Sequence, residues 1–583
     1  MEKCGARHPD DVTTLIALAF ALHACTALAS PPSPAARCHE GIDVVPLQTD
    51  RGLVCGLRRV ADNGVTYASF RGVPYAKQPV GELRFKELVP ADPWTVRNAT
   101  QEGPICIQTD VLYKDLMNQT QMKNQDEACI YANIHVPLEP RPGVTRRLAG
   151  ATALLPILVF IHGGGFAFGS GDSDLHGPEY LVSKKVIVIT FNYRLNVFGF
   201  LSMNTPQIPG NAGLRDQVTL LNWVQRNAKN FGGDPNDVTI AGQSAGAVAA
   251  HLLTLSPATT GLFKRAILMS GTAASTFYSS SPAYAQLMSS YVLNILGIAS
   301  TDPDHVHRKL IELPAEKLKE VNQMILDGSG LATFVPTVES PLPGVTTIID
   351  DDPDTLIANG RGKDIPLLVG YTSAECETFR NRLEEFNLIP KIQNNSALIV
   401  PPKILFMTPI GIHADLAKEI ETKYYDGVNM NSFIKTCSAA YYEYPALKLA
   451  QQRALTGGAP VFLYRFAYEG HSNVIKQATG QTYEGVGHIE DLTYVFKPNI
   501  ALNAPGATTP SNDDLSMKNL MTDVFVNFMK TNKPLLPSIW PADDGRQFEE
   551  LRSPTLILSK EFSASQQELI TFFNSLASRR PPT

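Results

Sequence analysis

A serine lies between two glycines in the pentapeptide GQSAG, whose central residue is Ser244. The apolar residues that end at Ala241 are typical of a buried strand, and residues 245–255, rich in alanine and leucine, are typical of a helix. A sharp turn between the two would hold its central residue in strained backbone angles, with the hydroxyl at the helix N-terminus. Because a helix dipole favours developing negative charge there, we predict that Ser244 is a nucleophile.

Three consecutive glycines occur in IHGGGF, residues 161–166, which follows another apolar run upstream of the serine. Glycines can turn their backbone N–H groups inward, and acyl transfer needs such donors around the oxyanion that forms. The N–H of the residue after the nucleophile completes the set, so the predicted donors are Gly164, Gly165 and Ala245. The alternative is a flexible turn, which the position of the glycines at the end of a buried strand disfavours.

Three histidines follow residue 380, and one of them should be the general base, since the expected chain order is serine, acid, histidine. His413 lies on a predicted amphipathic helix and His471 in a polar loop, which favours structural or solvent-facing roles. His488 lies in the glycine-rich stretch EGVGHIEDL, where the imidazole can reach back over the sheet edge. We therefore predict that His488 takes the proton of Ser244.

Two glutamates are candidates for the acid that orients this histidine. In IPLLVGYTSAECETF a buried-strand pattern ends at Gly370, and Glu375 and Glu377 follow. Either carboxylate could accept a hydrogen bond from the imidazole Nδ1–H and stabilise the charged ring. The residue pattern alone leaves both open.

These groups need a scaffold that brings distant loops together. Residues 154–166 and 184–195 are long apolar runs, typical of central strands that are covered on both faces. Residues 43–70 alternate around Asp62-Asn-Gly, which predicts antiparallel strands. Further strands are predicted at 266–269, 365–369, 461–466 and 555–558, and helices at 213–230 and within 285–330 and 410–456. This order predicts an α/β fold with one large, mostly parallel central sheet, helices on both faces and helical insertions.

The composition suits a large enzyme. Of 583 residues, 44% are hydrophobic, the formal net charge is −6 and no long basic run occurs, which argues against nucleic acid as the main partner. Since there is no internal repeat and no clean domain break, we predict a single catalytic domain over residues 30–583. Acyl transfer at such a site needs no metal and no organic cofactor.

The N-terminus is typical of a secretory signal peptide. Lys3 and Arg7 precede an apolar run at 15–24, and Ala27-Leu-Ala29 matches the small residues of a cleavage site before Ser30. The run is too short to span a bilayer easily, so we expect residues 1–29 to be removed and the mature protein to be secreted, with no membrane span.

The mature chain carries other marks of export. Six cysteines remain after removal of the signal peptide, which favours one or two disulfides together with buried free thiols. Sequons for N-glycans begin at Asn98, Asn118 and Asn394.

Seven segments of the chain resemble the carboxylesterase/cholinesterase family of α/β-hydrolases: FRGVPYAKQPVGELRF, ACIYANIHVP, HGGGFAFGSG, NYRLNVFGFL, GNAGLRDQVTLLNWVQRNAKNFGGDP, VTIAGQSAGA and GHIEDLTYVF. The resemblance covers nearly the whole mature chain. It implies an α/β-hydrolase fold, places the acid at Glu375 and implies a disulfide between Cys106 and Cys129. In the family a glycine usually follows the acid, whereas Cys376 follows it here.

Within this family, GQSAG combined with TSAECETFRNRL and GVGHIEDLTYVF is most similar to the insect juvenile hormone esterases. That resemblance implies a serine esterase of the haemolymph that hydrolyses the methyl ester of a sesquiterpenoid hormone, and we expect a monomer. No tryptophan lies between Cys106 and Cys129, where cholinesterases carry theirs, and the uncharged Gln243 precedes the nucleophile. Both features favour a small, neutral, apolar ester.

Two alternatives are a general carboxylesterase of dietary, xenobiotic or odorant esters, and a hormone-binding or adhesion protein without catalysis. The presence of all three predicted catalytic residues disfavours the second.

Overall fold

The computed structural model describes residues 38, 43–109, 112, 124–138, 153–278, 281–329, 334–471, 473–502, 508–542 and 544–579. The predicted signal peptide, residues 1–29, and the sequon at Asn118 lie outside the described residues. All the residues predicted to act in catalysis are described.

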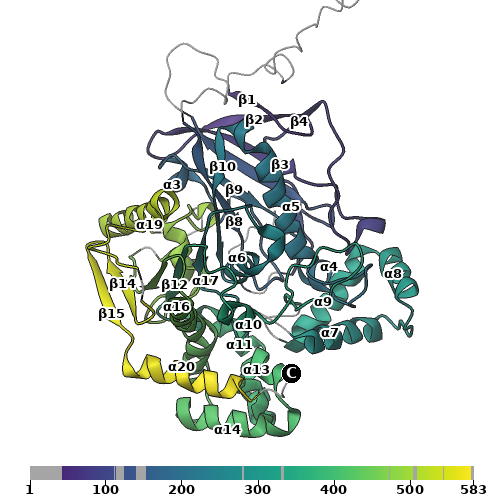
Figure 1. The fold of residues 1–583 in the computed structure, drawn as a ribbon, viewed down its shortest axis with the longest axis vertical. Coiled ribbons are helices and arrows are strands. Elements are labelled where there is room, and N and C mark those ends of the chain that lie inside the picture. Colours follow the sequence, from purple (N-terminus) through teal and green to yellow (C-terminus); the bar gives the residue numbers. More distant parts are fainter. Residues whose placement is uncertain are drawn as a thin grey trace, which may run out of the picture.

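A sheet of thirteen strands runs through the described chain (Figure 1). Along its path the order is β1-β2-β3-β7-β9-β8-β10-β11-β12-β13-β14-β15, and β4 pairs with β2. The strands from β9 to β14 are parallel to their neighbours within that block, whereas β1, β2, β3 and β7 at one side and β15 at the other form antiparallel pairs.

The strands of this sheet are Val44–Gln48 (β1), Leu53–Val60 (β2), Thr66–Pro74 (β3), Val96–Asn98 (β4), Tyr131–Pro137 (β7), Leu155–Ile161 (β8), Ile187–Phe191 (β9), Gly233–Gln243 (β10), Arg265–Met269 (β11), Leu367–Thr372 (β12), Val461–Phe466 (β13), Gln547–Ser553 (β14) and Leu556–Glu561 (β15). A separate parallel pair consists of Ile105–Cys106 (β5) and Gln125–Asp126 (β6).

Helices cover both faces of the sheet (Figure 1). On one face, α6 packs on β8, β10 and β11 with α5 beside it, and α16 packs on β12 and β13. On the other face, α3 and α19 cover β7, β8, β9 and β10. These helices are Glu179–Val182 (α3), Ala212–Asn227 (α5), Ala245–Leu255 (α6), Tyr444–Thr456 (α16) and Asn512–Thr531 (α19).

The remaining α-helices are Asn196–Phe200 (α4), Pro282–Ile295 (α7), Pro303–Glu312 (α8), Ala315–Ser329 (α9), Pro353–Ala358 (α10), Arg380–Glu385 (α11), Leu388–Asn394 (α12), Pro402–Met407 (α13), His413–Tyr424 (α14), Met430–Ser438 (α15), Val474–Thr479 (α17), Asn499–Leu502 (α18) and Ala564–Ala577 (α20).

The sequence of β8, LPILVFI, shows how one apolar run builds two cores. Ile157, Val159 and Ile161 join the core beneath α5 and α6, whereas Leu158 and Phe160 join the core beneath α3 and α19. Successive strand residues point to opposite faces, so a strand covered on both sides must be apolar throughout. Each such side chain contributes roughly 1.5–3 kcal/mol when fully buried.

The predicted class, an α/β fold with a mostly parallel sheet and helices on both faces, is confirmed. Predicted and observed bounds coincide for β13 and α6, and β8 and β9 lie inside the predicted apolar runs. β14 was not predicted, because its sequence QFEELRS contains adjacent glutamates. Glu550 is nevertheless buried, since Arg465 and Lys560 on the neighbouring strands each approach it to 2.7 Å.

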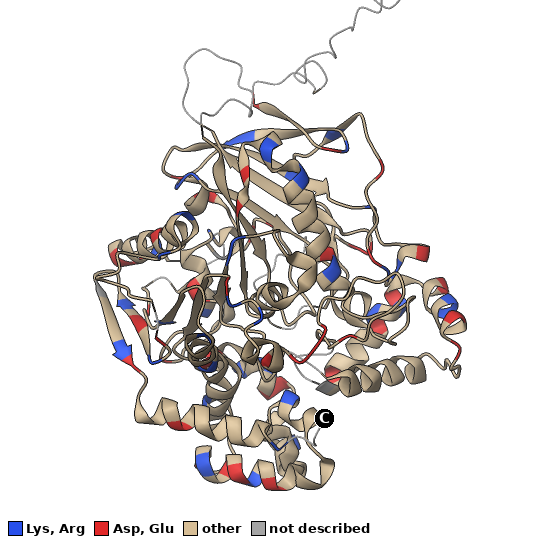
Figure 2. Cartoon of the chain, viewed as in Figure 1, with Lys and Arg blue, Asp and Glu red and all other residues tan. Residues whose placement is uncertain are grey.

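Two groups of helices are inserted between consecutive parallel strands. α7 to α9 lie between β11 and β12, and α11 to α15 lie between β12 and β13. Charged side chains of both signs are interspersed over the outer helices, whereas α7 carries none (Figure 2). Within the described ranges, no helix is both long enough and apolar enough to cross a membrane.

Candidate active site

Ser244 lies at the tight turn between β10 and α6. Its backbone angles, φ 59° and ψ −128°, are rare for a residue with a side chain and store strain. The flanking glycines permit the turn: a Cβ on Gly242 would lie 2.2 Å from backbone atoms of Gly246, and a Cβ on Gly246 would lie 2.0 Å from the carbonyl oxygen of Ile161. The Ser244 N–H donates to the carbonyl of Met269 at 2.8 Å, which ties the turn to the next strand.

His488 and Glu375 form a buried pair. Nδ1 of His488 lies 2.6 Å from Oε2 of Glu375, and the backbone N–H of His488 donates to the Glu375 carbonyl at 3.1 Å. The other carboxylate oxygen, Oε1, accepts the N–H of Thr372 at 2.7 Å. Glu377, the second candidate acid, is instead paired with Arg380 at 2.9 Å. Of the two glutamates, Glu375 is therefore the one in contact with the imidazole.

The parallel sheet explains how three distant segments meet. β10 ends at Gln243, β12 leads into the turn η5 (Glu375–Phe379), and His488 lies in the chain that follows β13. Parallel strands present their carboxyl ends at one edge of a sheet, and ligand sites of open α/β sheets form there. Ser244 and His488 line one pocket at this edge, together with Gly164 and Gly165.

The predicted oxyanion donors lie next to the serine. Gly164 and Gly165 form part of the pocket wall, and Ala245 is the first residue of α6. No described residue accepts a hydrogen bond from the N–H groups of these three residues. Free donors at the positive end of a helix favour a negatively charged oxygen, as a tetrahedral intermediate requires.

Two tyrosines that sequence reasoning missed contact the predicted catalytic groups. The ring of Tyr442, in the π-helical turn η8 (Ala439–Glu443), lies 4.8 Å from the ring of His488. Its hydroxyl lies 3.0 Å from that of Tyr278, which lines the same pocket as Ser244. No sequence signal marks either tyrosine, because η8 reaches the site only through the packing of the second insertion.

A buried carboxyl group, that of Asp491, lies three residues after His488. Asp491 is fully buried and accepts a hydrogen bond from Tyr464 at 3.3 Å. Burial, and next the charge of Glu375, raises the pKa of Asp491 to about 8, so the group is mainly neutral at pH 7. At pH 7 the imidazole of His488 therefore has one full negative charge beside it, that of Glu375, and Asp491 adds little to it.

The other two C-terminal histidines lie away from this pocket. His413, at the start of α14, contacts the carbonyl of Thr408 at 3.1 Å through Nε2, and His471 is exposed. Neither residue lines the pocket of Ser244.

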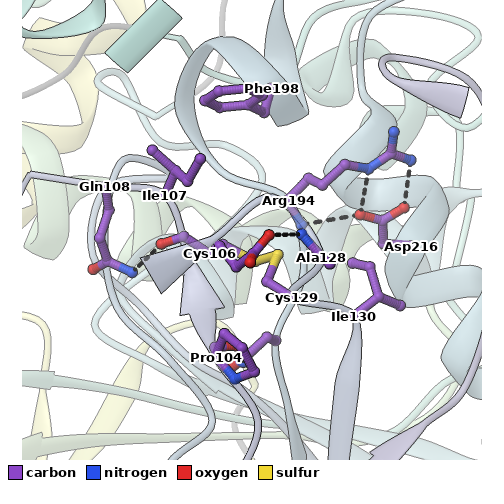
Figure 3. The surroundings of a disulfide bond; sticks show 12 residues. Pro104, Cys106, Ile107, Gln108, Ala128, Cys129, Ile130, Arg194, Phe198 and Asp216 are labelled. Atoms are coloured by element: carbon purple, nitrogen blue, oxygen red, sulfur yellow. Dashed lines mark hydrogen bonds and ion pairs between the residues drawn. A yellow bond between two sulfur atoms is a disulfide. The ribbon is translucent and has the colours of Figure 1, made fainter. Parts of the chain in front are cut away.

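A disulfide joins Cys106 to Cys129, as the family resemblance implies (Figure 3). It fixes the segment that carries Gln108, whose amide exchanges two hydrogen bonds with Gly169: Oε1 accepts the Gly169 N–H at 2.7 Å and Nε2 donates to the carbonyl at 3.0 Å. Gly169 belongs to the loop that begins with the three glycines, so the disulfide supports the loop that bears the oxyanion donors.

The expectation of one or two disulfides with free thiols is wrong. All six cysteines that follow residue 29 are described, and they form three disulfides, the other two being Cys38–Cys55 and Cys376–Cys437. Cys376 directly follows Glu375, and Cys437 lies near the end of α15, so the third disulfide ties the turn of the acid to the second insertion. Sequence spacing gave no signal, because the two cysteines are 61 positions apart.

A larger cavity of about 660 Å³ lies next to the catalytic pocket. Its walls, formed by α7, α9, α11, α12, α13 and α15, are mainly apolar and aromatic. Phe277 lines both spaces and stacks on Tyr441 with ring centroids 5.0 Å apart. We call this cavity the chamber; its volume falls within the roughly 300–1,000 Å³ typical of small-molecule sites.

Two of the predicted sequons are described. Asn98 in β4 and Asn394 at the end of α12 are both exposed. In the part of the chain that the structure describes, no group of three or more His, Cys, Asp or Glu residues is arranged to hold a metal ion.

Comparisons with known proteins give the class of this α/β fold as a carboxylic-ester hydrolase. A profile described as "Carboxylesterase family" matches residues 43–562, and the chain belongs to that family.

Among curated relatives, the juvenile hormone esterase of Heliothis virescens is 63% identical over 97% of this chain and 99% of its own length. The juvenile hormone esterase of Tribolium castaneum is 31% identical, with 83% of each chain covered. Among solved structures, the juvenile hormone esterase of Manduca sexta with OTFP covalently attached superposes with a TM-score of 0.87 at 50% identity, covering 92% of this chain and all of the other.

Proposed function

We propose that this protein hydrolyses the methyl ester of a juvenile hormone, a sesquiterpenoid, with Ser244 as nucleophile, His488 as general base and Glu375 as the acid that orients the base. The observation that carries this proposal is the buried 2.6 Å contact between His488 and Glu375, beside a strained serine and a large apolar chamber. The relatives named as juvenile hormone esterases support the choice of substrate.

In the first half of the reaction, the Ser244 hydroxyl attacks the ester carbon as Nε2 of His488 takes its proton. The carbonyl electrons move to the oxygen, and the N–H groups of Gly164, Gly165 and Ala245 stabilise that charge. When the carbonyl re-forms, the bond to the methoxy oxygen breaks, and His488 returns the proton to the departing methanol.

In the second half, water attacks the acyl-enzyme by the same route, and the free acid and Ser244 are regenerated. Both oxygens of Glu375 accept hydrogen bonds, and the carboxylate stabilises the imidazolium without taking its proton. It fixes the imidazole with its proton on Nδ1, which leaves the Nε2 lone pair available to accept a proton.

The chamber suits an isoprenoid tail. Its lining is dominated by apolar and aromatic side chains, and each buried CH₂ contributes about 0.8 kcal/mol to binding. α7, which supplies part of the wall, has no charged residue. A cationic ester would find no carboxylate among the described residues of the chamber lining, whereas a long neutral ester can be desolvated there.

Steady-state kinetics on the purified protein test the substrate and the nucleophile together. We expect kcat/KM for the hormone to exceed that for a short naphthyl ester, and Ser244→Ala to lower both by at least about a thousandfold. Ser290→Ala, on the exposed side of α7, is the matched control and should change neither. A higher kcat/KM for the naphthyl ester would favour a general carboxylesterase. Hydrolysis by Ser244→Ala at the normal rate would reject the site itself.

The proposal also covers location and assembly. The signal peptide at residues 1–29 directs secretion into the haemolymph, residues 30–583 form one domain, and the protein is a monomer with N-glycans at Asn98, Asn118 and Asn394. The three disulfides support an oxidising compartment. N-terminal sequencing of the secreted protein should begin at Ser30, and its mass in solution should fall by the glycan mass after enzymatic deglycosylation.

A further inference from the structure

Gln243, which directly precedes the serine, contacts the far nitrogen of the catalytic imidazole. Nε2 of Gln243 lies 3.1 Å from Nε2 of His488, and each residue is only 2% exposed. The mechanism above gives this amide no part, although it touches the atom that must accept the serine proton.

The hydrogen positions in this contact follow from Glu375. An ionised carboxylate can only accept, so the proton of a neutral His488 must sit on Nδ1, where it is donated to Glu375 at 2.6 Å. Nε2 of His488 then carries a lone pair, and only a donor can bind it. The group of Gln243 that faces Nε2 is therefore its NH₂, which donates to the imidazole.

The glycine loop leaves room for this arrangement. A Cβ on Gly163 would lie 2.7 Å from Oε1 of Gln243 and 3.0 Å from Cβ of Ser244, so any larger residue would push the amide away from its position. The first of the three glycines thus accommodates Gln243, whereas the second and third face the pocket of the serine.

The surroundings favour an uncharged group at position 243. Gln243 separates the catalytic pocket from a second pocket that is lined by His162, Asp172, Asp174 and His176. Burial raises the pKa of Asp172 well above its usual range, and burial together with the charge of Glu102 raises the pKa of Asp174 to about 6. A glutamate at 243 would add a third carboxylate to this region and place it next to His488.

We propose that Gln243 is a positioning residue: its side-chain N–H donates to the resting imidazole of His488, keeps the ring uncharged and in register beside Ser244, and turns the proton of the charged ring toward the leaving group. This inference rests on the proposed function, since it takes His488 as the base.

The proton path shows the second effect. In the resting enzyme the Nε2 lone pair is held by Gln243, and the hydroxyl of Ser244 must displace that weak contact to deliver its proton. Once Nε2 carries a proton, it faces the amide of Gln243 as donor against donor, which is repulsive. The Nε2–H is then better directed at the methoxy oxygen, to which it passes when methanol leaves.

Several other ionisable groups surround His488, and they must be the same in the unmodified enzyme and in the variants at position 243. They are Glu375 from η5, Asp491 from η9 (Asp491–Tyr494), Tyr442 from η8, Tyr278 from the loop after β11, and, across Gln243, His162, Asp172, Asp174 and His176. A single substitution at 243 leaves all of them in place, so the difference between two pH profiles reports on Gln243.

The test is the pH dependence of kcat/KM for Gln243→Glu and Gln243→Met, with Gln48→Glu on the exposed end of β1 as the control for added charge. A carboxylate about 3 Å from the imidazole favours its charged form, so the acid limb of Gln243→Glu should move up by at least about one pH unit. In Gln243→Met the hydrogen bond to the neutral ring is lost, which should move the acid limb up by less than about one pH unit. Gln48→Glu should not move it.

The low-field proton resonance of His488 Nδ1–H provides a second readout, which does not depend on turnover. It should titrate at the same pH as the acid limb in each enzyme, and it shows that the His488–Glu375 pair is intact. If the acid limb of Gln243→Glu stays at the pH of the unmodified enzyme while this resonance is present, the inference is overturned. Equal shifts in Gln243→Glu and Gln48→Glu would also overturn it.

Failure of the proposed function has a different signature. If His488 were not the base, the acid limb would survive removal of the imidazole in His488→Ala, whatever happens at 243. If Gln243→Glu does not fold, the uncharged Gln243→Met still tests the hydrogen bond from Gln243. If Gln243→Met has a normal unfolding transition and its acid limb does not move up, the hydrogen bond does not determine the pH of that limb.

Discussion

Replacing Glu375 by glutamine should inactivate the enzyme by trapping the wrong form of the histidine. Oε1 of Glu375 accepts the backbone N–H of Thr372 at 2.7 Å, and Oε2 faces Nδ1 of His488 at 2.6 Å. In Glu375→Gln the amide must keep its oxygen toward Thr372, because its NH₂ there would meet a donor. The NH₂ then faces Nδ1, which must become the acceptor, so the imidazole proton moves to Nε2.

The size of the effect follows from that exchange. A histidine protonated on Nε2 cannot take the Ser244 proton, and the analogous change in a serine protease lowers kcat by about ten thousandfold. We expect a loss of about 10³–10⁴ in kcat/KM, equivalent to roughly 4–5 kcal/mol of transition-state stabilisation. KM should change little, because Glu375 does not line the substrate pocket.

The matched control is Glu377→Gln, two residues away. Glu377 pairs with Arg380 with about a fifth to a quarter of each side chain exposed, so its loss should change kcat/KM less than threefold. The assay is ester hydrolysis by both variants, with thermal unfolding curves to show that each is folded. If Glu375→Gln kept more than a tenth of the activity, or if Glu377→Gln lost more activity than Glu375→Gln, the assignment of the acid would be refuted.

Three other changes have defined outcomes. Asp491 has a folded-state pKa of about 8 against a usual value near 4, so between these pH values the folded protein holds a proton that the unfolded chain releases. The free energy of unfolding therefore falls as the pH rises from about 4 to about 8. Asp491→Asn should remove up to about 1.4 kcal/mol per pH unit of that fall, measured by urea unfolding at pH 5 and pH 8. An equal pH dependence in both proteins would contradict the burial argument. Phe277→Ala joins the catalytic pocket to the chamber and should raise kcat/KM for bulky-acyl esters relative to acetyl esters; an unchanged ratio would mean that Phe277 does not limit access. Replacing both Cys376 and Cys437 by serine should lower kcat more than loss of the N-terminal disulfide, because only the former adjoins the acid; equal effects would show a purely global role.

The central strands and α6 could be predicted because local pattern and global position agree there. Apart from Arg465, β13 is a run of buried apolar and aromatic residues, and such a run carries its own signal. β14 could not be found in this way, since its buried Glu549 and Glu550 depend on partners that arrive from neighbouring strands.

The same distinction applies to the site. Ser244 and the glycine loop are defined by short motifs at strand ends, so sequence alone located them. Glu375 and Glu377 are two positions apart, and only the course of η5 shows which one faces the imidazole. Tyr442 lies next to His488 because of how α15 and η8 pack, and a single sequence holds no trace of that contact.

The origin of the chamber walls has a consequence for how such proteins diverge. The walls come from segments inserted between strands, residues 282–329 and 380–438, whereas the reacting groups sit on short turns at the sheet edge. Mutations that reshape the inserted helices but spare the Cys376–Cys437 disulfide leave the reacting groups in place. The substrate specificity of such an enzyme can therefore change gradually during evolution, without an inactive intermediate.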